Sequence, residues 1–287
     1  MSTTTPNISI IIVGYRSQHT LPACLESIAL QTDCTAEVIY VENAPDHPGI
    51  STVNAHYPNA IIVEPGDNLG YGKGCNAGAH VARGDYLLFL NPDTELKGAD
   101  TLATLCQFMQ AHPDVGVCTP LLYNENNTQA DNTLRYDYFG HRYVGHLFKH
   151  LPGDIAWICG AAMVIPKSLF EQISGFDERY FMYSDDVDIC LDVRKAGYTI
   201  AEAPTAAIMH IGGESSKNWN SAELFYRIEL SKIIFTQKHY NKQQHDYIWK
   251  RCRSRYRRAL ITSALLYPRK LSHYRGMLRA IRHASTR

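Results

Sequence analysis

The sequence predicts an α/β fold, with a mostly parallel, doubly wound sheet followed by a helical, basic C-terminal extension. The sheet is predicted by the first 120 residues, where short apolar runs alternate with stretches of helical periodicity. The extension is predicted by the long helical pattern that begins at Ser221 and by the charge of residues 238–287. Those 50 residues carry 14 Lys or Arg and one acid, Asp246, whereas the remaining 237 carry 14 basic and 27 acidic groups.

Five strands are expected in the first 123 residues. Residues 8–15, ISIIIVGY, form a continuous apolar and β-branched run, which is typical of a strand buried on both faces. Similar runs predict the other strands, over residues 37–43, 60–66, 85–93 and 115–123.

Amphipathic stretches predict helices between these strands, over residues 20–31, 72–82 and 99–112. We expect Thr20 to be the N-cap of the first helix. A later helix is expected to begin near Asp186 and to end at Gly197. Residues 124–155 are irregular and rich in aromatic side chains and histidines, which favours a binding loop.

The eight cysteines are scattered, and no two form a CxxC pair. This pattern supports neither a disulfide framework nor a zinc site, and it favours a reduced, cytoplasmic protein. No late apolar run reaches the roughly 20 residues that a membrane-spanning helix needs, so we expect a protein that does not cross a membrane. The segregated charge indicates an anionic partner at the basic end, either a membrane surface or nucleic acid.

Polar side chains gather where the predicted strands end, and doubly wound sheets bind ligands at those ends. These side chains are Tyr15, Arg16, Glu42, Asn43, Asp67, Asn68, Asn91 and Asp93. Asp93 either holds a divalent cation together with phosphate oxygens or caps the turn after Pro92, and its position alone does not separate the two. His210 follows a short apolar strand and is either a structural histidine or a ligand to metal or phosphate near Asp93.

Two features point to a nucleotide. Glu42 would accept the imino NH of uracil or thymine and Tyr15 would stack on such a base, although a lone acid at a strand end is more often a turn residue. Residues 68–76, NLGYGKGCN, lead into a helix whose backbone NH groups attract phosphate, and Lys73 adds a cation. The stretch matches neither the Walker pattern nor GxGxxG, so on its own it favours a structural turn.

Residues 181–190, FMYSDDVDIC, place three aspartates behind an aromatic cluster. Asp185 and Asp188 have the spacing of a capping box, so we expect them to cap the helix and Asp185→Asn to cost about 0.5–2 kcal/mol of stability. Asp186 is left without a structural role. The neighbouring charges hinder its ionisation, which makes Asp186 a candidate general base.

These pieces occur together, and in one order, in a known family. They are the short stretches VGYRS, VENA, NLGYGKGCN, FLNPDTEL, RKAGY and HIGGESS and the long, specific stretch GAAMVIPKSLFEQISGFDERYFMYSDDVDICL. The chain resembles the inverting nucleotide-sugar glycosyltransferases of family 2, which have the Rossmann-like GT-A fold, and particularly their bacterial rhamnosyltransferase-like branch. The resemblance implies a GT-A domain over residues 1–216, with a nucleotide-sugar half to about residue 120 and an acceptor half over about 121–216. The extension would then be 217–287.

The resemblance also implies roles for single residues. Asn91-Pro92-Asp93 corresponds to a reduced DXD motif in which Asp93 binds Mg²⁺ or Mn²⁺, and His210 lies on the metal or diphosphate side. Asp185 and Asp186 correspond to a Glu-Asp pair whose second member is the catalytic base. The nucleotide-sugar site would comprise Tyr15, Glu42, Asn43, Asn68, Gly70, Lys73, Asn76 and Asn91.

The implied reaction moves a sugar from a nucleoside diphosphate to a lipid-linked or cell-surface saccharide, as in lipopolysaccharide O-antigen biosynthesis. The resemblance favours dTDP-rhamnose as the donor, ahead of a UDP-sugar such as UDP-galactofuranose. One alternative is a nucleotidyltransferase acting on sugar phosphates, although residues 13–20, VGYRSQHT, lack its glycine-rich phosphate loop. The other is a catalytically inactive scaffold, against which the joint presence of Asp93, Asp186 and His210 argues.

The basic extension mixes Arg and Lys with large apolar side chains, namely Trp249, Tyr256, Leu260, Ile261, Leu265 and Leu266. Such a composition suits a membrane interface, where each basic residue near an anionic leaflet contributes about 1 kcal/mol. We therefore expect a peripheral protein on the inner face of the plasma membrane. The alternative is a solvated helix packed on the catalytic domain. The acidic body would repel nucleic acid, so we expect no nucleic-acid partner.

Overall fold

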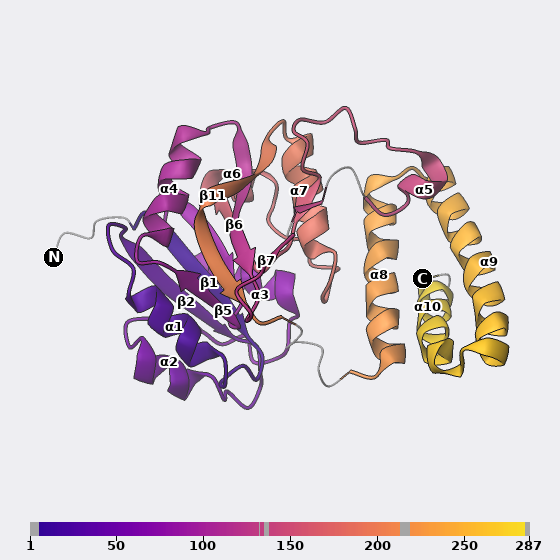
Figure 1. Cartoon of the computed structure of the whole chain (residues 1–287), viewed down its shortest axis with the longest axis horizontal. Helices are drawn as coiled ribbons and strands as arrows, with labels where there is room; N and C mark the ends of the chain where they lie inside the picture. Colours follow the sequence, from indigo (N-terminus) through magenta and orange to yellow (C-terminus); the bar gives the residue numbers. More distant parts are fainter. Residues whose placement is uncertain (1–5, 132, 135–137, 213–218, 285–287) are drawn as a thin grey trace.

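A central sheet and a group of long C-terminal helices lie side by side, with α7 (Asp185–Lys195) between them (Figure 1). The computed structural model describes residues 6–131, 133–134, 138–212 and 219–284 of the 287-residue chain. The boundary expected at residue 216 and the last four residues of the HIGGESS stretch lie outside the described residues.

The first half of the sheet has the predicted parallel arrangement. All five expected strands are present, as β1 (Ile8–Gly14), β2 (Ala36–Glu42), β3 (Ile61–Val63), β4 (Tyr86–Leu90) and β6 (Val115–Tyr123). β1 pairs in parallel with β2 and β4, and β2 pairs in parallel with β3. Every residue of β1 is buried, as expected for a strand covered on both faces.

The second half of the sheet is mixed, which the sequence pattern did not predict. It adds β5 (Thr94–Lys97), β7 (Gln129–Ala130), β10 (Ala162–Pro166) and β11 (Thr199–His210). The strand order is β3-β2-β1-β4-β10-β6-β11-β5, with β7 beside β6, and β8 (Thr133–Leu134) pairs separately with β9 (Trp157–Ile158). β11 runs parallel to β6, whereas β10 is antiparallel to β4 and β6 and β5 is antiparallel to β11. The α/β fold is thus confirmed, with antiparallel strands added where the site lies.

Helices cover both faces of the sheet. One face carries α1 (Leu21–Ala29), α2 (Ile50–His56) and α4 (Thr101–Ala111), and the other carries α3 (Tyr71–Val81), α6 (Lys167–Gln172) and α7. Alternate residues of β1 supply the two apolar cores, since Ile10 and Ile12 belong to the first and Ile11 to the second. Each such side chain contributes about 1.5–3 kcal/mol through burial.

The start of α1 differs from the prediction. Thr20 has helical backbone angles, and its hydroxyl donates a hydrogen bond back to the carbonyl of Ser17 (3.2 Å). The Leu21 NH is bonded to the same carbonyl (3.0 Å). Thr20 is therefore not a side-chain N-cap, because the preceding turn already uses its hydroxyl.

The extension consists of α8 (Ser221–His239), α9 (Lys242–Leu266), the short 3₁₀ helix η2 (Pro268–Lys270) and α10 (Leu271–Ala284). A capping box begins α9, because the side chains of Asn241 and Gln244 each accept the backbone NH of the other residue. The small helix α5 (His141–Val144) comes from the aromatic segment before the site and packs against α9. None of the helices in the described ranges has the length and apolarity that a bilayer crossing demands.

A third apolar core joins the extension to the α/β body. Tyr138, Tyr180 and Leu191 enter it from the body, and Phe235, Trp249 and Tyr256 enter it from α8 and α9. Trp249 and Tyr256 are buried there. The expectation that these two side chains lie in a membrane interface is therefore wrong, and the alternative of a helix packed on the catalytic domain holds for this part of α9.

The far end of α9 is different. Ile261 and Leu266 are 66% and 65% exposed, and Leu260 is partly buried. The side chain of Leu265 lies outside the described residues. An exposed apolar surface thus remains at this end of the helix, beside basic side chains.

Candidate active site

A cavity of about 720 Å³ lies between the sheet, the start of α7 and the extension. One side, which we call the acidic wall, is formed by Asn91, Asp93, Asp185, Asp186 and His210. The sequence singled out these five residues in three separate stretches. The structure brings them together at one cavity.

The β5 strand explains why His210 meets Asp93. In the antiparallel pairing of β11 with β5, His210 lies opposite Thr94, the residue after Asp93. Nε2 of His210 is 3.3 Å from Oδ1 of Asp93, and the Gly212 NH donates to Oδ2 of Asp93 (3.2 Å). Nδ2 of Asn91 is 3.5 Å from the same histidine nitrogen. The ring of His210 thus faces a buried carboxylate at the cavity, as the ligand interpretation requires.

The Asp93–His210 pair suits a hard divalent cation. A carboxylate and a neutral imidazole are ligands that Mg²⁺ or Mn²⁺ accepts, and phosphate oxygens would complete the coordination shell. Both side chains line the cavity, where a diphosphate has room.

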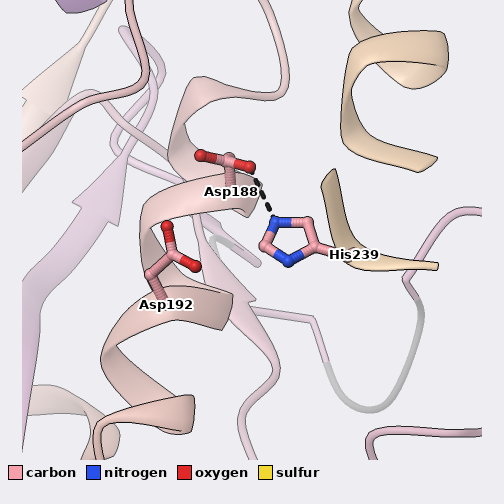
Figure 2. A group of neighbouring side chains, drawn as sticks. All are labelled: Asp188, Asp192 and His239. Carbon is pink, nitrogen blue, oxygen red and sulfur yellow. Dashed lines mark hydrogen bonds and ion pairs between the residues drawn. The ribbon is translucent and has the colours of Figure 1, made fainter. Parts of the chain in front are cut away.

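A second cluster, Asp188, Asp192 and His239, has potential metal-ligand atoms within 4.8 Å of one another (Figure 2). However, Nζ of Lys238 is 2.6 Å from Oδ2 of Asp188 and 2.5 Å from Oδ2 of Asp192. Nε2 of His239 is 2.7 Å from the other oxygen of Asp188. The cluster already contains a cation and does not line the cavity, so we interpret it as the contact that fixes α7 to α8.

The expected capping box of Asp185 and Asp188 is absent, which corrects the prediction. α7 begins at Asp185, and Ser184 precedes it with a φ of 61° and without a side-chain cap. Asp188 instead accepts the hydroxyl of Tyr180 (3.0 Å) and the ammonium of Lys238. The spacing suggested a local interaction, but α8 offers Asp188 a stronger, charged partner.

Asp185 and Asp186, at the start of α7, differ in their hydrogen bonds. Asp186 accepts the NH groups of Val187 (2.8 Å) and Gly160 (3.2 Å). Oδ2 of Asp185 is buried and has no hydrogen-bond partner among the described residues. Burial raises the pKa of both carboxyl groups, and the charge of Asp186 raises the pKa of Asp185 further. Both carboxylates therefore bind a proton more readily than an aspartate in solvent does.

The NLGYGKGCN stretch holds the segments that flank Asp185 and Asp186 in place. Of its residues, the cavity lining includes Tyr71. Gly70 has a φ of 83°, and a Cβ there would lie 2.2 Å from the carbonyl oxygen of Phe181. The Tyr71 NH donates to that carbonyl (3.0 Å), and the Tyr71 hydroxyl donates to the carbonyl of Gly160 (3.0 Å). Only a glycine at position 70 allows this close approach. The loop thus positions the two segments on either side of Asp186.

Two asparagines predicted to bind the nucleotide sugar have structural partners. Nδ2 of Asn43 donates to the carbonyl of Gly70 (2.8 Å), and its Oδ1 accepts the Leu69 NH (3.1 Å). The amide of Asn76 bonds to both the carbonyl (2.9 Å) and the NH (3.0 Å) of Phe176. These contacts occupy both amides, so the ligand contacts expected of Asn43 and Asn76 are corrected.

Glu42 also lacks the free carboxylate that the expected nucleobase contact requires. It is 1% exposed and accepts the NH groups of Ala44 (3.0 Å) and Gly49 (2.7 Å) and the hydroxyl of Tyr40 (3.3 Å). The strand-end acid thus holds its own turn, as strand-end acids commonly do.

The remaining nucleotide candidates lie outside the cavity or at its edge. Tyr15 is 47% exposed at the end of β1, with the guanidinium of Arg16 5.7 Å from its ring centroid. Nζ of Lys73 is 3.7 Å from the carboxylate of Glu178. Asn68 accepts the Gly70 NH (3.0 Å). Among the remaining candidates, which are Tyr15, Asn68, Gly70 and Lys73, Tyr15 presents the most accessible surface for a base.

The cavity also has a wall that the sequence did not predict, which we call the helical wall. It consists of residues 138–143, Trp157, Ile228, Lys232, Phe235, Arg255 and Tyr256. Nε1 of Trp157 is buried without a hydrogen-bond partner among the described residues. The aromatic composition of residues 124–155 signalled part of this wall, but no local pattern indicates that α8 and α9 fold back onto it.

Comparison with known proteins decides the family. The family model described as glycosyl transferase family 2 matches residues 9–174, more than half of the chain. The chain belongs to this family. It is therefore a glycosyltransferase, and the nucleotidyltransferase alternative is set aside.

Two curated relatives are similar over most of their length. The chain is 24% identical to the N-acetylglucosaminyl-diphospho-decaprenol L-rhamnosyltransferase of Mycobacterium tuberculosis, over 81% of this chain and 85% of the relative. It is 26% identical to the rhamnosyltransferase WbbL of Escherichia coli, over 75% of this chain and 87% of the relative. The resemblance to the rhamnosyltransferase-like branch is confirmed.

Solved structures support the fold of this glycosyltransferase. Staphylococcus aureus TarS, solved with UDP-GlcNAc, superposes with a TM-score of 0.57 at 17% identity, over 84% of this chain and 70% of the other. The mannosyltransferase PcManGT of Pyrobaculum calidifontis, solved with GDP-Man and Mn²⁺, has the same TM-score and identity, over 99% of this chain and 87% of the other. The predicted GT-A fold is confirmed.

Proposed function

We propose that this glycosyltransferase moves rhamnose from dTDP-rhamnose to a lipid-linked saccharide acceptor, with inversion at the anomeric carbon. The observation that carries the proposal is one cavity that joins the Asp93–His210 pair to the Asp185–Asp186 pair. The first pair would bind the metal that holds the diphosphate of the donor. The second pair would take the proton from the hydroxyl of the acceptor. The names of the two curated relatives support the choice of rhamnose. A UDP-sugar is the second candidate donor.

Asp186 acts as the general base in this proposal. It removes the proton of the acceptor hydroxyl while the oxygen bonds to the anomeric carbon, and the diphosphate leaves from the opposite face with the bonding electrons. One displacement gives inversion. Burial raises the pKa of Asp186, so its carboxylate is a stronger base than a solvated aspartate, and the NH groups of Val187 and Gly160 fix its orientation.

Asp93 and His210 would hold Mg²⁺ or Mn²⁺ in this proposal. When bound, the cation stabilises the negative charge that develops on the leaving diphosphate. The neighbouring mannosyltransferase structure contains Mn²⁺ with its nucleotide sugar, which supports this choice of metals. Asn91 lies beside His210 and orients its ring.

The nucleoside would lie along the ends of β1 and β2, outside the acidic wall. Tyr15 offers an exposed ring for stacking on the base. Asn68, Gly70 and Lys73 surround the start of α3, where backbone NH groups favour phosphate or ribose oxygens. The acceptor would occupy the space between the acidic and helical walls. The extension 217–287 thus contributes to the acceptor site as well as to the proposed position on the inner face of the plasma membrane.

The test is transfer from dTDP-rhamnose and from UDP-sugars to a lipid-linked saccharide, with NMR of the product to assign its anomeric configuration. We expect dTDP-rhamnose to be used and its configuration to invert. A thermal-shift screen of the same donors with Mn²⁺ identifies the bound nucleotide independently, because a ligand that binds only the native state raises the melting temperature. Retention of configuration would contradict the single displacement.

A further inference from the structure

Two cysteines that are far apart in the sequence lie in contact in the α/β body. Sγ of Cys34 is 3.8 Å from Sγ of Cys106, although 72 positions separate the two residues in the chain. Cys34 lies in the loop between α1 and β2, and Cys106 lies in α4. Both are free thiols. No spacing motif joins them, so the fold alone brings the two sulfur atoms together.

We propose that Cys34 and Cys106 form a redox-active dithiol, which a hydroperoxide such as hydrogen peroxide converts into a disulfide and a thiol reductant restores. This inference goes beyond the proposed function, because neither cysteine lines the cavity. It assigns a site of reversible covalent modification to the α/β body.

The two thiols differ in their access to an oxidant. Cys34 is half-buried, whereas Cys106 is 5% exposed and belongs to the first apolar core. A hydroperoxide dissolved in water therefore reaches Cys34 first. A hydrogen bond with the Cys106 thiol also lowers the pKa of Cys34, which favours the thiolate that reacts with peroxides. Cys34 is thus the sulfur that is oxidised, and Cys106 is the sulfur that then attacks it.

The oxidation takes place in two steps. The thiolate of Cys34 attacks one oxygen of hydrogen peroxide, the O–O bond breaks, hydroxide leaves, and Cys34 becomes a sulfenic acid. The sulfur of Cys106 then attacks the sulfur of Cys34, the S–O bond breaks, and a second hydroxide leaves. The protons of the two thiols convert both hydroxide ions into water. The sulfur atoms together lose two electrons, which reduce the peroxide.

Hydrogen bonds beside the cysteines hold the loop against α4. The side-chain amide of Gln31 donates to the carbonyl of Gly98 (2.7 Å) and accepts the NH of Leu102 (3.1 Å). Leu102 precedes Cys106 by four residues, so the two lie on the same face of α4. The loop therefore follows this face of the helix and presents Cys34 to Cys106.

The loop can also accommodate the bond. The two sulfur atoms must approach from 3.8 Å to the roughly 2.05 Å of a disulfide. Cys34 belongs to neither a helix nor a strand, so its backbone can absorb this movement. The Thr32 NH donates to the carbonyl of Ala99 (2.7 Å), which keeps the loop attached near the start of α4. Closure thus requires a shift of Cys34 and no rearrangement of the core.

The proposal is tested by adding equimolar hydrogen peroxide to the reduced full chain and counting the remaining thiols with dithionitrobenzoate in urea. We expect the chain to lose two of its eight thiols and its proteolytic digest to contain a peptide that joins Cys34 to Cys106. Dithiothreitol should restore both thiols. The melting temperature of the oxidised chain should rise by about 5 °C, because the cross-link restricts the unfolded chain.

Three variants assign the steps to single residues. Cys34→Ser should prevent the loss of thiols, and its place in a half-buried loop makes the substitution mild. Cys106→Ala should stop the reaction at the sulfenic acid of Cys34, which dimedone labels. Cys159→Ser is the matched control, because Cys159 is also half-buried, and it should still form the cross-link.

Three outcomes would overturn the proposal. The first is a disulfide-linked dimer on a non-reducing gel, since Cys34 would then react with a second chain. The second is a wild-type chain that keeps the sulfenic acid of Cys34 without a bond to Cys106. The third is a cross-linked chain with a lower melting temperature, since the bond would then form at the expense of the native fold. None of these measurements uses a sugar or a nucleotide, so a failure of the proposed function is recognised separately.

Discussion

Two pairs of aspartates on α7 have opposite surroundings. Asp188 and Asp192 face α8, where Lys238 contacts both carboxylates. His239 contacts Asp188 (Figure 2). Asp185 and Asp186 face the cavity, where, within the described part of the chain, neither forms an ion pair with Lys or Arg. The negative charge of Asp188 and Asp192 is thus compensated, and their contacts join α7 to α8. The charge of Asp185 and Asp186 is left uncompensated at considerable cost, which is the pattern expected of a functional site.

The largest effect should come from Asp186→Asn. Removing the general base should lower the transfer rate by about 10²–10⁴-fold. Donor affinity should stay close to that of the wild type, because Asp186 acts on the acceptor. Single-turnover kinetics together with titration of the nucleoside diphosphate separate these two quantities. If donor binding fell in parallel with the rate, Asp186 would be a metal ligand and not the base. The lack of an ion pair at Asp186 would then be explained by the metal.

Asp93→Ala should abolish the increase in nucleoside diphosphate affinity that Mn²⁺ produces. A carboxylate is the main charge that this wall offers a hard cation, so His210→Ala should weaken the increase less. Titration of the diphosphate with and without Mn²⁺ measures both variants. A metal-enhanced affinity that survives in Asp93→Ala would exclude Asp93 as the principal ligand.

Lys238→Met should lower the free energy of unfolding by about 3 kcal/mol, because it leaves the buried carboxylate of Asp188 with less compensation. Urea denaturation measures this change. Lys242→Met is the matched control, since the Lys242–Asp246 pair lies in solvent and should not affect the midpoint. In an Asp93→Ala background, which lacks the proposed metal site of the cavity, EDTA should not change the midpoint; a drop there would mean that the Asp188–Asp192–His239 cluster holds a metal.

Asp185→Asn should be slightly stabilising above neutral pH, contrary to the loss expected from a helix cap. Folding raises the pKa of Asp185 above its unfolded value of about 3.9, so the folded state holds the proton more tightly. Ionisation then destabilises the native protein increasingly as the pH rises from that value to the raised pKa of the folded state. Asn removes this penalty. Denaturation at pH 4 and pH 8 should show a gain at pH 8 that fades at pH 4, and a loss at both would restore the capping interpretation.

The sequence predicted the acidic wall because its residues follow local rules. Asp93 closely follows an apolar strand and Asp186 lies in the first turn of a helix. Both patterns can be recognised from a few neighbouring residues. The pairing of β5 with β11 joins residues far apart in the chain, and so does the contact of α9 with α5. No local periodicity reports such pairings. The sequence pattern therefore does not predict the helical wall. For the same reason the composition of α9 suggests a membrane interface for Trp249 and Tyr256, although both belong to the third core.

Glu42, Asn43 and Asn76 show a second reason for error. Each is a polar residue at a strand end or helix start, where either a ligand or the backbone of a turn can take its hydrogen bonds. Their partners are the backbone groups of Gly49, Gly70 and Phe176, respectively. Distinguishing the two uses requires knowing which loop packs nearby, which only the three-dimensional structure shows.

The smallest effect that we expect concerns membrane binding by the exposed end of α9. Removing residues 238–287 would also remove Trp249 and Tyr256 from the third core, so a truncation would not isolate this function. Ile261→Ser and Leu266→Ser change only exposed side chains and should leave the denaturation midpoint unchanged. Each removes apolar surface that would enter the interface beside Arg257, Arg258 and Lys270, so binding to anionic vesicles should fall several-fold while its steep salt dependence remains. Leu30→Ser is the control, because Leu30 is a similarly exposed leucine in the α/β body. Cosedimentation of the α9 variants to the same extent as the wild type and Leu30→Ser would exclude this end of the helix as the membrane contact.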